Sequence, residues 1–378
     1  MVIFTYQLPS SLSFDNFAEV EADILKQIEG HSYDEIVLDA QGMKYISSAG
    51  LRVVLGLKKK FDKVCVINTS ISVYDIFEMT GFTNIVTVEK ALRQVSVDGC
   101  KIIGKGAHGT VYSTAPDTIV KVYELGSSLE DINRERELSK KAFVLGLPTA
   151  IALDTVKVGD QYGTVFELLN AESCVNYVKQ SQKNLDDFAD KAVEVLKKMH
   201  TTVCDDPSLP DMKKSHLKYV DNIRIFLSDQ EYLKLKKFIE DIPEAKTLIH
   251  GDFHLKNQLL VGNDLMLIDM DTLCTGNPIF EMASVCNSYF EFGEIRRAAI
   301  EDFLGISLET ANYLWKTISR KYYSDLNDEQ YQLAIDKARL IGCVRALHYL
   351  KKRNMPEEDK KKCLEHIREL LKKTTYLL

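Results

Sequence analysis

The sequence predicts two domains, a small α/β domain over residues 1–95 and a larger α+β domain over 96–378 whose C-terminal part is largely helical. Three observations carry this prediction. The chain has 378 residues, more than one hydrophobic core usually supports. Short apolar strands alternate with amphipathic helices up to about residue 95. After Gly99, a glycine-rich segment continues as strand, turn and strand.

The composition is that of an ordinary globular protein, with 45% apolar and 27% charged residues. A net charge of −7 argues against a general nucleic-acid partner, which would need a basic surface. The start of the chain lacks the basic n-region and the long apolar run that are typical of a signal peptide, and no run approaches the roughly 18 apolar residues of a membrane span. The eight cysteines show no C-x-x-C pair and no metal-ligand spacing. We therefore expect free thiols, a cytoplasmic location, and neither nucleic acid nor membrane as partner.

The elements of the first domain follow from hydrophobic periodicity. Phe17, Val20, Ile24 and Ile28 recur at helical spacing and give one apolar face. The expected order is strand 2–7, helix 17–28, strand 35–39, helix 48–60, strand 64–67, helix 73–79 and strand 85–88.

Segments V-L-D-A at 37–40, Y-I-S-S-A-G-L at 45–51 and I-F-E-M-T-G-F at 76–82 resemble the STAS domain, the family of bacterial anti-sigma-factor antagonists. In that family a serine that begins the helix after the second core strand is phosphorylated by a partner kinase, and this position falls on Ser48. The family often has Asp before and Ser or Thr after it, whereas Ser47 and Ala49 stand here. The resemblance implies a protein partner for this domain. The alternative is that both serines only cap the helix.

The second domain opens with Gly104, Gly106 and Gly109 in a G-x-G-x-x-G pattern. Dinucleotide-binding folds share this spacing, but there the last glycine opens a helix. Here 110–113 and 118–123 both have strand character and are joined by a turn. This context favours a loop whose backbone N–H groups fold over the phosphates of ATP.

Lys121 falls on the third strand of this segment, between two valines. We expect its ammonium group to contact phosphate and to need a carboxylate that holds it. Either Glu135 or Glu137 on the following helix could reach it.

The strongest signal is I-H-G-D-F-H-L-K-N at 249–257, followed by L-I-D-M-D at 267–271. Phosphoryl transfer needs an oriented acceptor hydroxyl and metal ions across the phosphates. Asp252 is expected to act as the catalytic base for the hydroxyl. Asn257 and Asp269 supply the oxygen ligands that Mg²⁺ prefers. His254 is either structural or close to the substrate. Asp271 either binds the metal itself or supports a residue that does.

These motifs resemble H-G-D-x-x-x-x-N and I-D-x-D of the aminoglycoside phosphotransferase and choline kinase family, over about 100 to at least 285. G-N-P-I-F-E-M-A at 276–283 resembles a further family segment, G-D-P-x-x-D-L-A. The resemblance implies a bilobal kinase-like fold, with an N-lobe over about 96–169 and a C-lobe over about 170–378. It also implies ATP-dependent transfer of the γ-phosphoryl group to a hydroxyl of a small molecule such as an amino alcohol, aminoglycoside or sugar-like compound.

The same resemblance selects Glu137 as the partner of Lys121. It makes 165–170 the hinge, where the main chain of Glu167 and Leu169 would bond adenine. Glu291 and Glu294 become candidates for binding an amine acceptor, because acidic groups here often do so in the family.

Two alternatives remain at this stage. The second domain could be a protein serine kinase that acts on Ser48 of its own or another STAS domain, or a nucleotide-binding signalling module without catalysis. Gly251 and the I-D-x-D sequence favour a small-molecule kinase, since protein kinases have Asp-Phe-Gly at the latter place.

Overall fold

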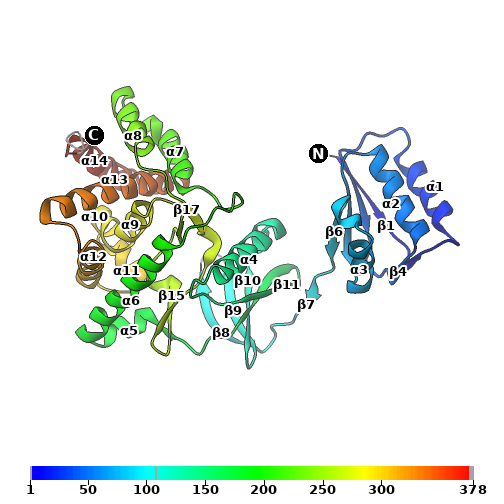
Figure 1. The fold of residues 1–378 in the computed structure, drawn as a ribbon, viewed down its shortest axis with the longest axis horizontal. Coiled ribbons are helices and arrows are strands. Elements are labelled where there is room, and N and C mark those ends of the chain that lie inside the picture. Colours follow the sequence, from blue (N-terminus) through cyan, green and yellow to red (C-terminus); the bar gives the residue numbers. More distant parts are fainter. Residues whose placement is uncertain (1, 107–108, 374–378) are drawn as a thin grey trace. The chain divides into compact units, whose positions relative to one another are not determined.

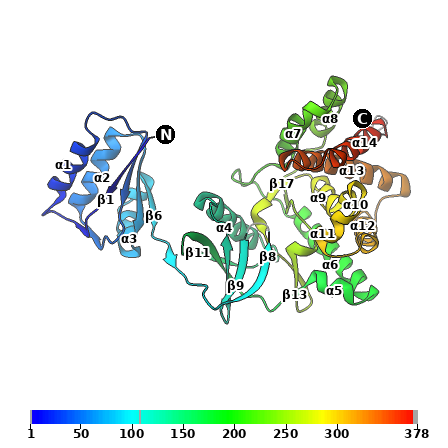
Figure 2. The ribbon, with the colours of Figure 1, turned by 180° about the vertical axis from the view of Figure 1, so that it is seen from behind.

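A computed structural model describes residues 2–106 and 109–373. The chain divides into two compact units (Figures 1 and 2). The first comprises Met1–Ser96 and Val156–Asp160, and the second comprises Val97–Thr155 and Gln161–Leu378. Among the helices of the described ranges, none combines the length and apolar character that crossing a membrane requires.

The first unit is built on a parallel sheet of order β1-β3-β5-β6. The apolar faces of its helices are buried with the sheet in one core. This is the small α/β layer structure that the alternation of elements predicts. The strands are β1 (Ile3–Gln7), β2 (Ser11–Leu12), β3 (Glu35–Asp39), β4 (Tyr45–Ile46), β5 (Val64–Thr69), β6 (Thr87–Lys90) and β7 (Arg93–Gln94), and the helices are α1 (Phe17–Ile28), α2 (Ser48–Lys60) and α3 (Ile71–Met79).

Several boundaries in this unit differ by one or two residues from the sequence prediction, and two of these differences have a visible local cause. Helix α3 begins at Ile71 because the Ser70 hydroxyl accepts a hydrogen bond from the Val73 N–H at 3.4 Å and so caps the helix. Strand β6 begins at Thr87, two residues later than expected. The N–H groups of residues 85 and 86 both donate to the carbonyl of Phe82, so these residues continue a turn instead of the sheet.

The second unit begins with a sheet of order β11-β12-β10-β9-β8. Helix α4 follows this sheet's third strand in the chain and contacts β12. In Figure 1 the cyan strands of this sheet and α4 lie beside the helical remainder of the unit. The elements are β8 (Lys101–Gly106), β9 (Gly109–Ala115), β10 (Thr118–Tyr123), α4 (Leu129–Val144), β11 (Ala152–Val158) and β12 (Gln161–Glu167).

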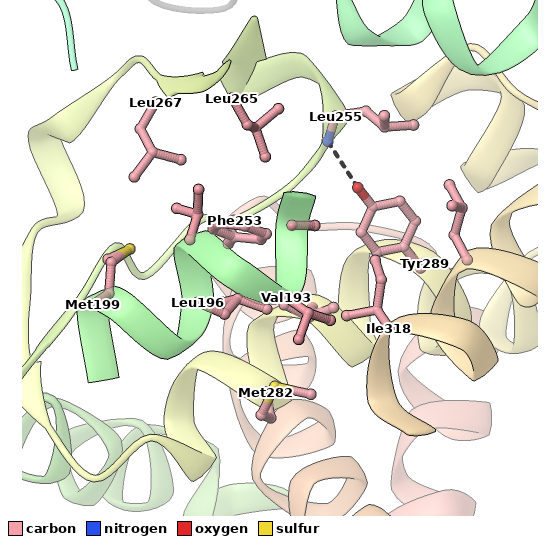
Figure 3. Close-up of a cluster of buried hydrophobic side chains, with 14 of the residues drawn as sticks. Val193, Leu196, Met199, Phe253, Leu255, Leu265, Leu267, Met282, Tyr289 and Ile318 are labelled. Atoms are coloured by element: carbon pink, nitrogen blue, oxygen red, sulfur yellow. Dashed lines mark hydrogen bonds between the residues drawn. The ribbon is translucent and has the colours of Figure 1, made fainter. Parts of the chain in front are cut away.

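The remainder of this unit is largely helical, which confirms the predicted fold class. Its core includes Phe253 and Tyr289, both fully inaccessible to solvent (Figure 3). Burying each such side chain contributes about 1.5–3 kcal/mol. The helices are α5 (Cys174–Gln180), α6 (Gln182–Thr201), α7 (Met212–Ile223), α8 (Asp229–Glu240), α9 (Ile279–Cys286), α10 (Phe292–Ile295), α11 (Ala298–Leu304), α12 (Leu308–Tyr322), α13 (Asp328–Lys352) and α14 (Glu357–Lys373).

Short strands hold the polar motifs in place between these helices. The loop 250–257 lies between β14 and β15, and Asp269 follows β16. Because β14 pairs with β17 and β15 pairs with β13 and β16, both ends of the loop are anchored. The strands are β13 (Glu172–Ser173), β14 (Thr247–Ile249), β15 (Gln258–Val261), β16 (Asp264–Leu267) and β17 (Cys274–Gly276).

Candidate active site

Lys121 joins three elements of the second unit. Its Nζ lies 2.7 Å from Glu135 Oε1 on α4 and 2.7 Å from Asp269 Oδ1 after β16. Burial alone would lower the pKa of Lys121, but the carboxylates of Asp269 and Glu135 outweigh it and raise the pKa. The ammonium group therefore stays charged, and it is held between two carboxylates.

The expected partner of Lys121, Glu137, is wrong. Glu137 is exposed, with about half of its side chain accessible, and it pairs with Lys140 at 3.3 Å. Residues two apart on a helix face nearly opposite directions, so only one of the two glutamates can face the sheet. Glu135 lies three residues after buried Ile132 and belongs to the apolar stripe of α4. That spacing was the signal in the sequence that could have selected it.

The glycine-rich segment connects β8 to β9, and its residues 107–108 lie outside the described residues. Gly104 and Gly106 belong to β8, and Gly109 begins β9 with φ +152°. A Cβ on Gly109 would lie 2.1 Å from the Val122 carbonyl oxygen, so only glycine fits there. A Cβ on Gly106 would meet nothing within 4 Å. The backbone there is open to the approach of another group.

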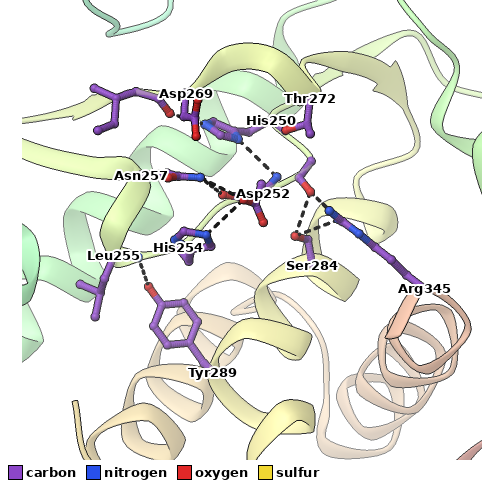
Figure 4. Close-up of polar contacts among 12 residues, drawn as sticks. His250, Asp252, His254, Leu255, Asn257, Asp269, Thr272, Ser284, Tyr289 and Arg345 are labelled. Carbon is purple, nitrogen blue, oxygen red and sulfur yellow. Dashed lines mark hydrogen bonds and ion pairs between the residues drawn. The ribbon is translucent and has the colours of Figure 1, made fainter. Parts of the chain in front are cut away.

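Asp252 is the centre of a hydrogen-bonded loop (Figure 4). Its Oδ2 accepts from His254 Nε2 at 3.1 Å and from Asn257 Nδ2 at 3.1 Å. Asn257 Nδ2 also donates to the Asp252 carbonyl oxygen at 3.0 Å. Burial raises the pKa of Asp252, but the hydrogen bond from His254 and the charge of Arg345 outweigh it and hold the pKa below its ordinary value. Asp252 is thus an ionised carboxylate at neutral pH.

His250 orders this loop and is not placed as a base. Its Nε2 lies 3.1 Å from the Ile268 carbonyl oxygen, and its Nδ1 lies 3.3 Å from the backbone nitrogen of Asp252. In this assignment Nε2 donates and Nδ1 accepts. Burial lowers the pKa of His250, which keeps the ring neutral. Both of its nitrogens are used for structure.

Gly251 has φ +82°, and a Cβ there would lie 2.9 Å from the Thr272 carbonyl oxygen. The turn therefore requires glycine. The buried Glu281 carboxylate accepts the N–H of His250 at 2.5 Å and the N–H of Gly251 at 3.1 Å. Glu281 thus fixes the backbone immediately before Asp252.

Several residues that support the loop were missed by sequence reasoning. The Gly251 carbonyl accepts from Ser284 Oγ at 3.1 Å and from the Arg345 guanidinium. The Leu255 N–H donates to the Tyr289 hydroxyl at 2.9 Å (Figures 3 and 4). Arg345 lies 94 positions from Gly251, and nothing local in the sequence marks the pairing.

Asp269 is held in an unusual backbone conformation, with φ 64° and ψ 62°. Such left-handed geometry is uncommon outside glycine and concentrates at functional sites. The Ile268 N–H donates to the Asn257 carbonyl at 3.0 Å, which ties the residue before Asp269 to the loop 250–257. Asn257 uses its Nδ2 toward Asp252, so its Oδ1 and the Asp269 carboxylate are hard oxygen donors of the kind that Mg²⁺ prefers. The residues present fit a Mg²⁺ ion.

The segment predicted as the hinge, 165–170, begins in β12 and continues past its end at Glu167. The Glu167 N–H donates to the Ile151 carbonyl at 3.2 Å, and its carboxylate accepts the Ile151 N–H at 2.7 Å. The N–H and the carboxylate of Glu167 are therefore both engaged within the protein. Beyond Leu169, Asn170 and Ala171 line a cavity of about 320 Å³.

The remaining candidates come from other segments of the chain. Ser48 is the exposed first residue of α2, and Ser47 is its cap, with Oγ accepting from the Gly50 N–H at 3.3 Å. Glu294 is exposed. Glu291 is fully buried and bonded by Arg339 at 2.9 Å, so the expectation that it binds an amine acceptor is wrong.

Comparison with known families adds to this geometry. The model of the phosphotransferase enzyme family, APH, matches residues 99–314, more than half of the chain. The chain belongs to this family. The STAS domain model matches residues 2–95. The predicted enzyme class, a phosphotransferase, and the predicted N-terminal STAS domain are thereby confirmed. Among curated proteins, none matches the chain.

Three solved structures are among those similar to this chain. Aminoglycoside phosphotransferase APH(2'')-Ib with ADP is 17% identical with a TM-score of 0.49, and covers 79% of this chain and 98% of its own. The streptomycin–ATP–APH(2")-IIa ternary complex is 18% identical with a TM-score of 0.46, over 79% and 95%. A choline/ethanolamine kinase family protein from Mesorhizobium loti is 11% identical with a TM-score of 0.45, over 73% and 87%.

Proposed function

We propose that this phosphotransferase moves the γ-phosphoryl group of ATP to a hydroxyl of a small molecule, with Asp252 as the catalytic base. The observation that carries the proposal is the single hydrogen-bonded assembly of Asp252, Asn257 and Asp269 with Lys121 at its edge. Phosphoryl transfer depends on positioning and electrostatic stabilisation, and these residues supply both.

Each residue has a distinct role. Lys121, fixed between Glu135 and Asp269, neutralises charge on the phosphates, and the backbone of Gly104, Gly106 and Gly109 lets the phosphates approach closely. The main chain of Glu167 and Leu169 bonds adenine at the hinge.

Asn257 and Asp269 would hold Mg²⁺, which when bound supplies positive charge across the phosphates. Asp252 accepts the hydrogen bond of the acceptor hydroxyl and receives its proton as the new P–O bond forms. Its pKa lies below the ordinary value, so the carboxylate is in the form that accepts a hydrogen bond throughout the neutral range.

The acceptor belongs to the class of small hydroxyl compounds, such as amino alcohols, aminoglycosides and sugars. The residues in support are Gly251 directly before Asp252 and the I-D-M-D sequence at 268–271. The test is ADP release by the full chain with Mg·ATP and each member of such a panel, beside the Asp252→Asn variant. Acceptor-dependent ADP release in the wild type alone is the expected result. Equal release by both proteins, or none above the acceptor-free rate for every compound, would contradict the proposal.

Glu135, and not Glu137, should matter for activity. Glu135→Gln keeps the size of the side chain but removes the charge that holds Lys121, and a hydrogen bond to a charged group contributes about 1.5–3 kcal/mol. We expect kcat/KM for ATP to fall about 10- to 100-fold. The matched control, Glu137→Gln, alters an exposed side chain and should change it by less than about twofold. Steady-state kinetics of both variants test this prediction. A larger effect of Glu137→Gln than of Glu135→Gln would contradict a functional role for the Lys121–Glu135 pair.

A second proposal concerns Ser48. Because Ser47 supplies the cap, the exposed Ser48 can carry a phosphate without loss of the cap, and the positive end of the α2 dipole tolerates that charge. After incubation with Mg·ATP, we expect the full chain to carry one phosphate on Ser48. The Ser48→Ala variant and the Asp252→Asn variant, each incubated alone, should carry none.

Mass spectrometry of the intact chain and its peptides measures this. Ser47→Ala is the matched control, since it removes the cap at a cost of about 1 kcal/mol but keeps the acceptor hydroxyl. Phosphate confined to other residues would contradict phosphorylation of Ser48 by this chain. In that case the STAS domain is left as a docking module, and Ser48→Asp should alter binding of its protein partner without altering turnover of the small acceptor.

A further inference from the structure

Three side chains with metal-binding atoms, none of them among the phosphate-handling residues, meet in the C-lobe. Glu291 comes from the π-helical turn Asn287–Glu291, Cys343 from α13 and His366 from α14. One ligand atom from each lies within 4.8 Å of the other two. His366 Nδ1 is hydrogen-bonded to Glu291 Oε1. We call these three residues the C-lobe cluster.

The C-lobe cluster places polar groups in the protein interior, where an unpaired polar group is destabilising. Glu291 and Cys343 are fully buried, and about a fifth of the His366 side chain is exposed. Arg339 Nε donates to Glu291 Oε2 at 2.9 Å and compensates the carboxylate charge. This bond occupies one oxygen, and Oε1 faces His366. The cluster thus has a fixed carboxylate, and its histidine is accessible from the surface.

A fourth donor lies beside the cluster. Cys363 is buried on α14, and its Sγ donates to the Cys343 carbonyl oxygen at 3.3 Å. Because Cys363 and His366 are three residues apart on one helix, their side chains share a face. The sequence therefore does contain a C-x-x-H spacing, although the two cysteines that meet here are 20 positions apart.

We propose that Glu291, Cys343 and His366, with Cys363 as the fourth ligand, bind a zinc ion. Thiolate, imidazole and carboxylate are the ligands that zinc takes in tetrahedral sites, whereas Mg²⁺ and Ca²⁺ select oxygen alone. With bonds of about 2.0–2.3 Å, tetrahedral ligand atoms lie roughly 3.3–3.8 Å apart. Metal binding would therefore move the hydrogen-bonded atoms His366 Nδ1 and Glu291 Oε1 apart, and it would bring in Cys363 Sγ, which is not one of the three atoms that lie within 4.8 Å of one another. Binding releases the thiol protons and the proton shared by His366 and Glu291.

The site would stabilise the scaffold of the catalytic loop. Helix α13 carries both Cys343 and Arg345, and Arg345 donates to the Gly251 carbonyl. The π-helical turn with Glu291 directly continues α9, which carries Ser284, the other donor to that carbonyl. Zinc would join these two elements to α14. Its removal should lower the melting temperature of the full chain.

The test is metal content and cobalt substitution of the full chain. We expect one zinc per chain, and in the cobalt form visible bands of a tetrahedral site with a sulfur-to-cobalt charge-transfer band in the near ultraviolet. His366→Asn, at a partly exposed position, and Cys343→Ser should weaken metal binding by at least about tenfold. Cys174→Ser, at a buried cysteine of α5, is the matched control and should retain the metal.

Wild-type protein that binds no zinc and gives no thiolate band with cobalt would overturn the proposal, as would unchanged affinity in Cys343→Ser. The thiolate band also separates this site from the proposed Mg²⁺ site, whose donors are oxygens. Failure of phosphoryl transfer would leave this result unaffected.

Discussion

Asp252→Asn is expected to lower kcat for phosphoryl transfer by about 10²- to 10⁴-fold, the range that a positioned general base contributes. The amide retains an oxygen that can accept from His254 and Asn257, so the loop should keep its shape. It cannot take the acceptor proton. The metal-binding oxygens of Asn257 and Asp269 are untouched, and nucleotide affinity should stay within about twofold.

The experiment pairs single-turnover kinetics with calorimetry of Mg·ATP binding. Asp264→Asn, an exposed aspartate of β16, is the matched control and should behave as the wild type. Wild-type turnover in Asp252→Asn would remove Asp252 from the reaction. Loss of turnover together with loss of folding, measured by circular dichroism, would assign it a structural role instead.

Asp269→Ala is expected to weaken the binding of Mg·ATP, the step before phosphoryl transfer. The substitution removes a metal oxygen and also one of the two carboxylates that hold Lys121 at 2.7 Å. Residues that only hydrogen-bond to a metal ligand already contribute about 10- to 100-fold to metal affinity. For the loss of a ligand itself, we expect Mg·ATP affinity to fall at least about tenfold. Affinity for ATP measured without Mg²⁺ should fall less, since only the Lys121 contact is affected.

Asp271→Ala is the informative companion to this variant. Asp271 lies two residues on, at an exposed position of the same turn. Calorimetric titrations of Mg·ATP into both variants rank the two carboxylates. If Mg·ATP affinity is unchanged in Asp269→Ala but falls in Asp271→Ala, then Asp271, and not Asp269, is the metal ligand.

Local sequence patterns were sufficient to predict that the polar residues of the loop 250–257 lie together. Asp252 and Asn257 are five positions apart in one turn, so their proximity follows from chain connectivity. The alternation of strands and helices over the first 95 residues likewise follows from side-chain periodicity. The sequence also placed Lys121 on a strand. That strand, β10, pairs with β9, which begins at the last glycine of the glycine-rich segment.

Contacts between distant segments could not be predicted in this way. The choice of Glu135 over Glu137 depends on which face of α4 meets the sheet, and Arg345 reaches Gly251 only because α13 packs beside α9. The C-lobe cluster joins positions 291, 343 and 366, whose ligand atoms meet only in the folded chain. Tertiary packing decides all three.

The central claim is transfer of phosphate to an acceptor oxygen at Asp252. The most direct measurement is ³¹P NMR of the full chain with Mg·ATP and an acceptor that stimulates ADP release. The account predicts a phosphomonoester resonance that grows with the same rate as ADP and is absent with Asp252→Asn. ADP accompanied only by inorganic phosphate, or a phosphomonoester formed equally by the Asp252→Asn variant, would contradict it.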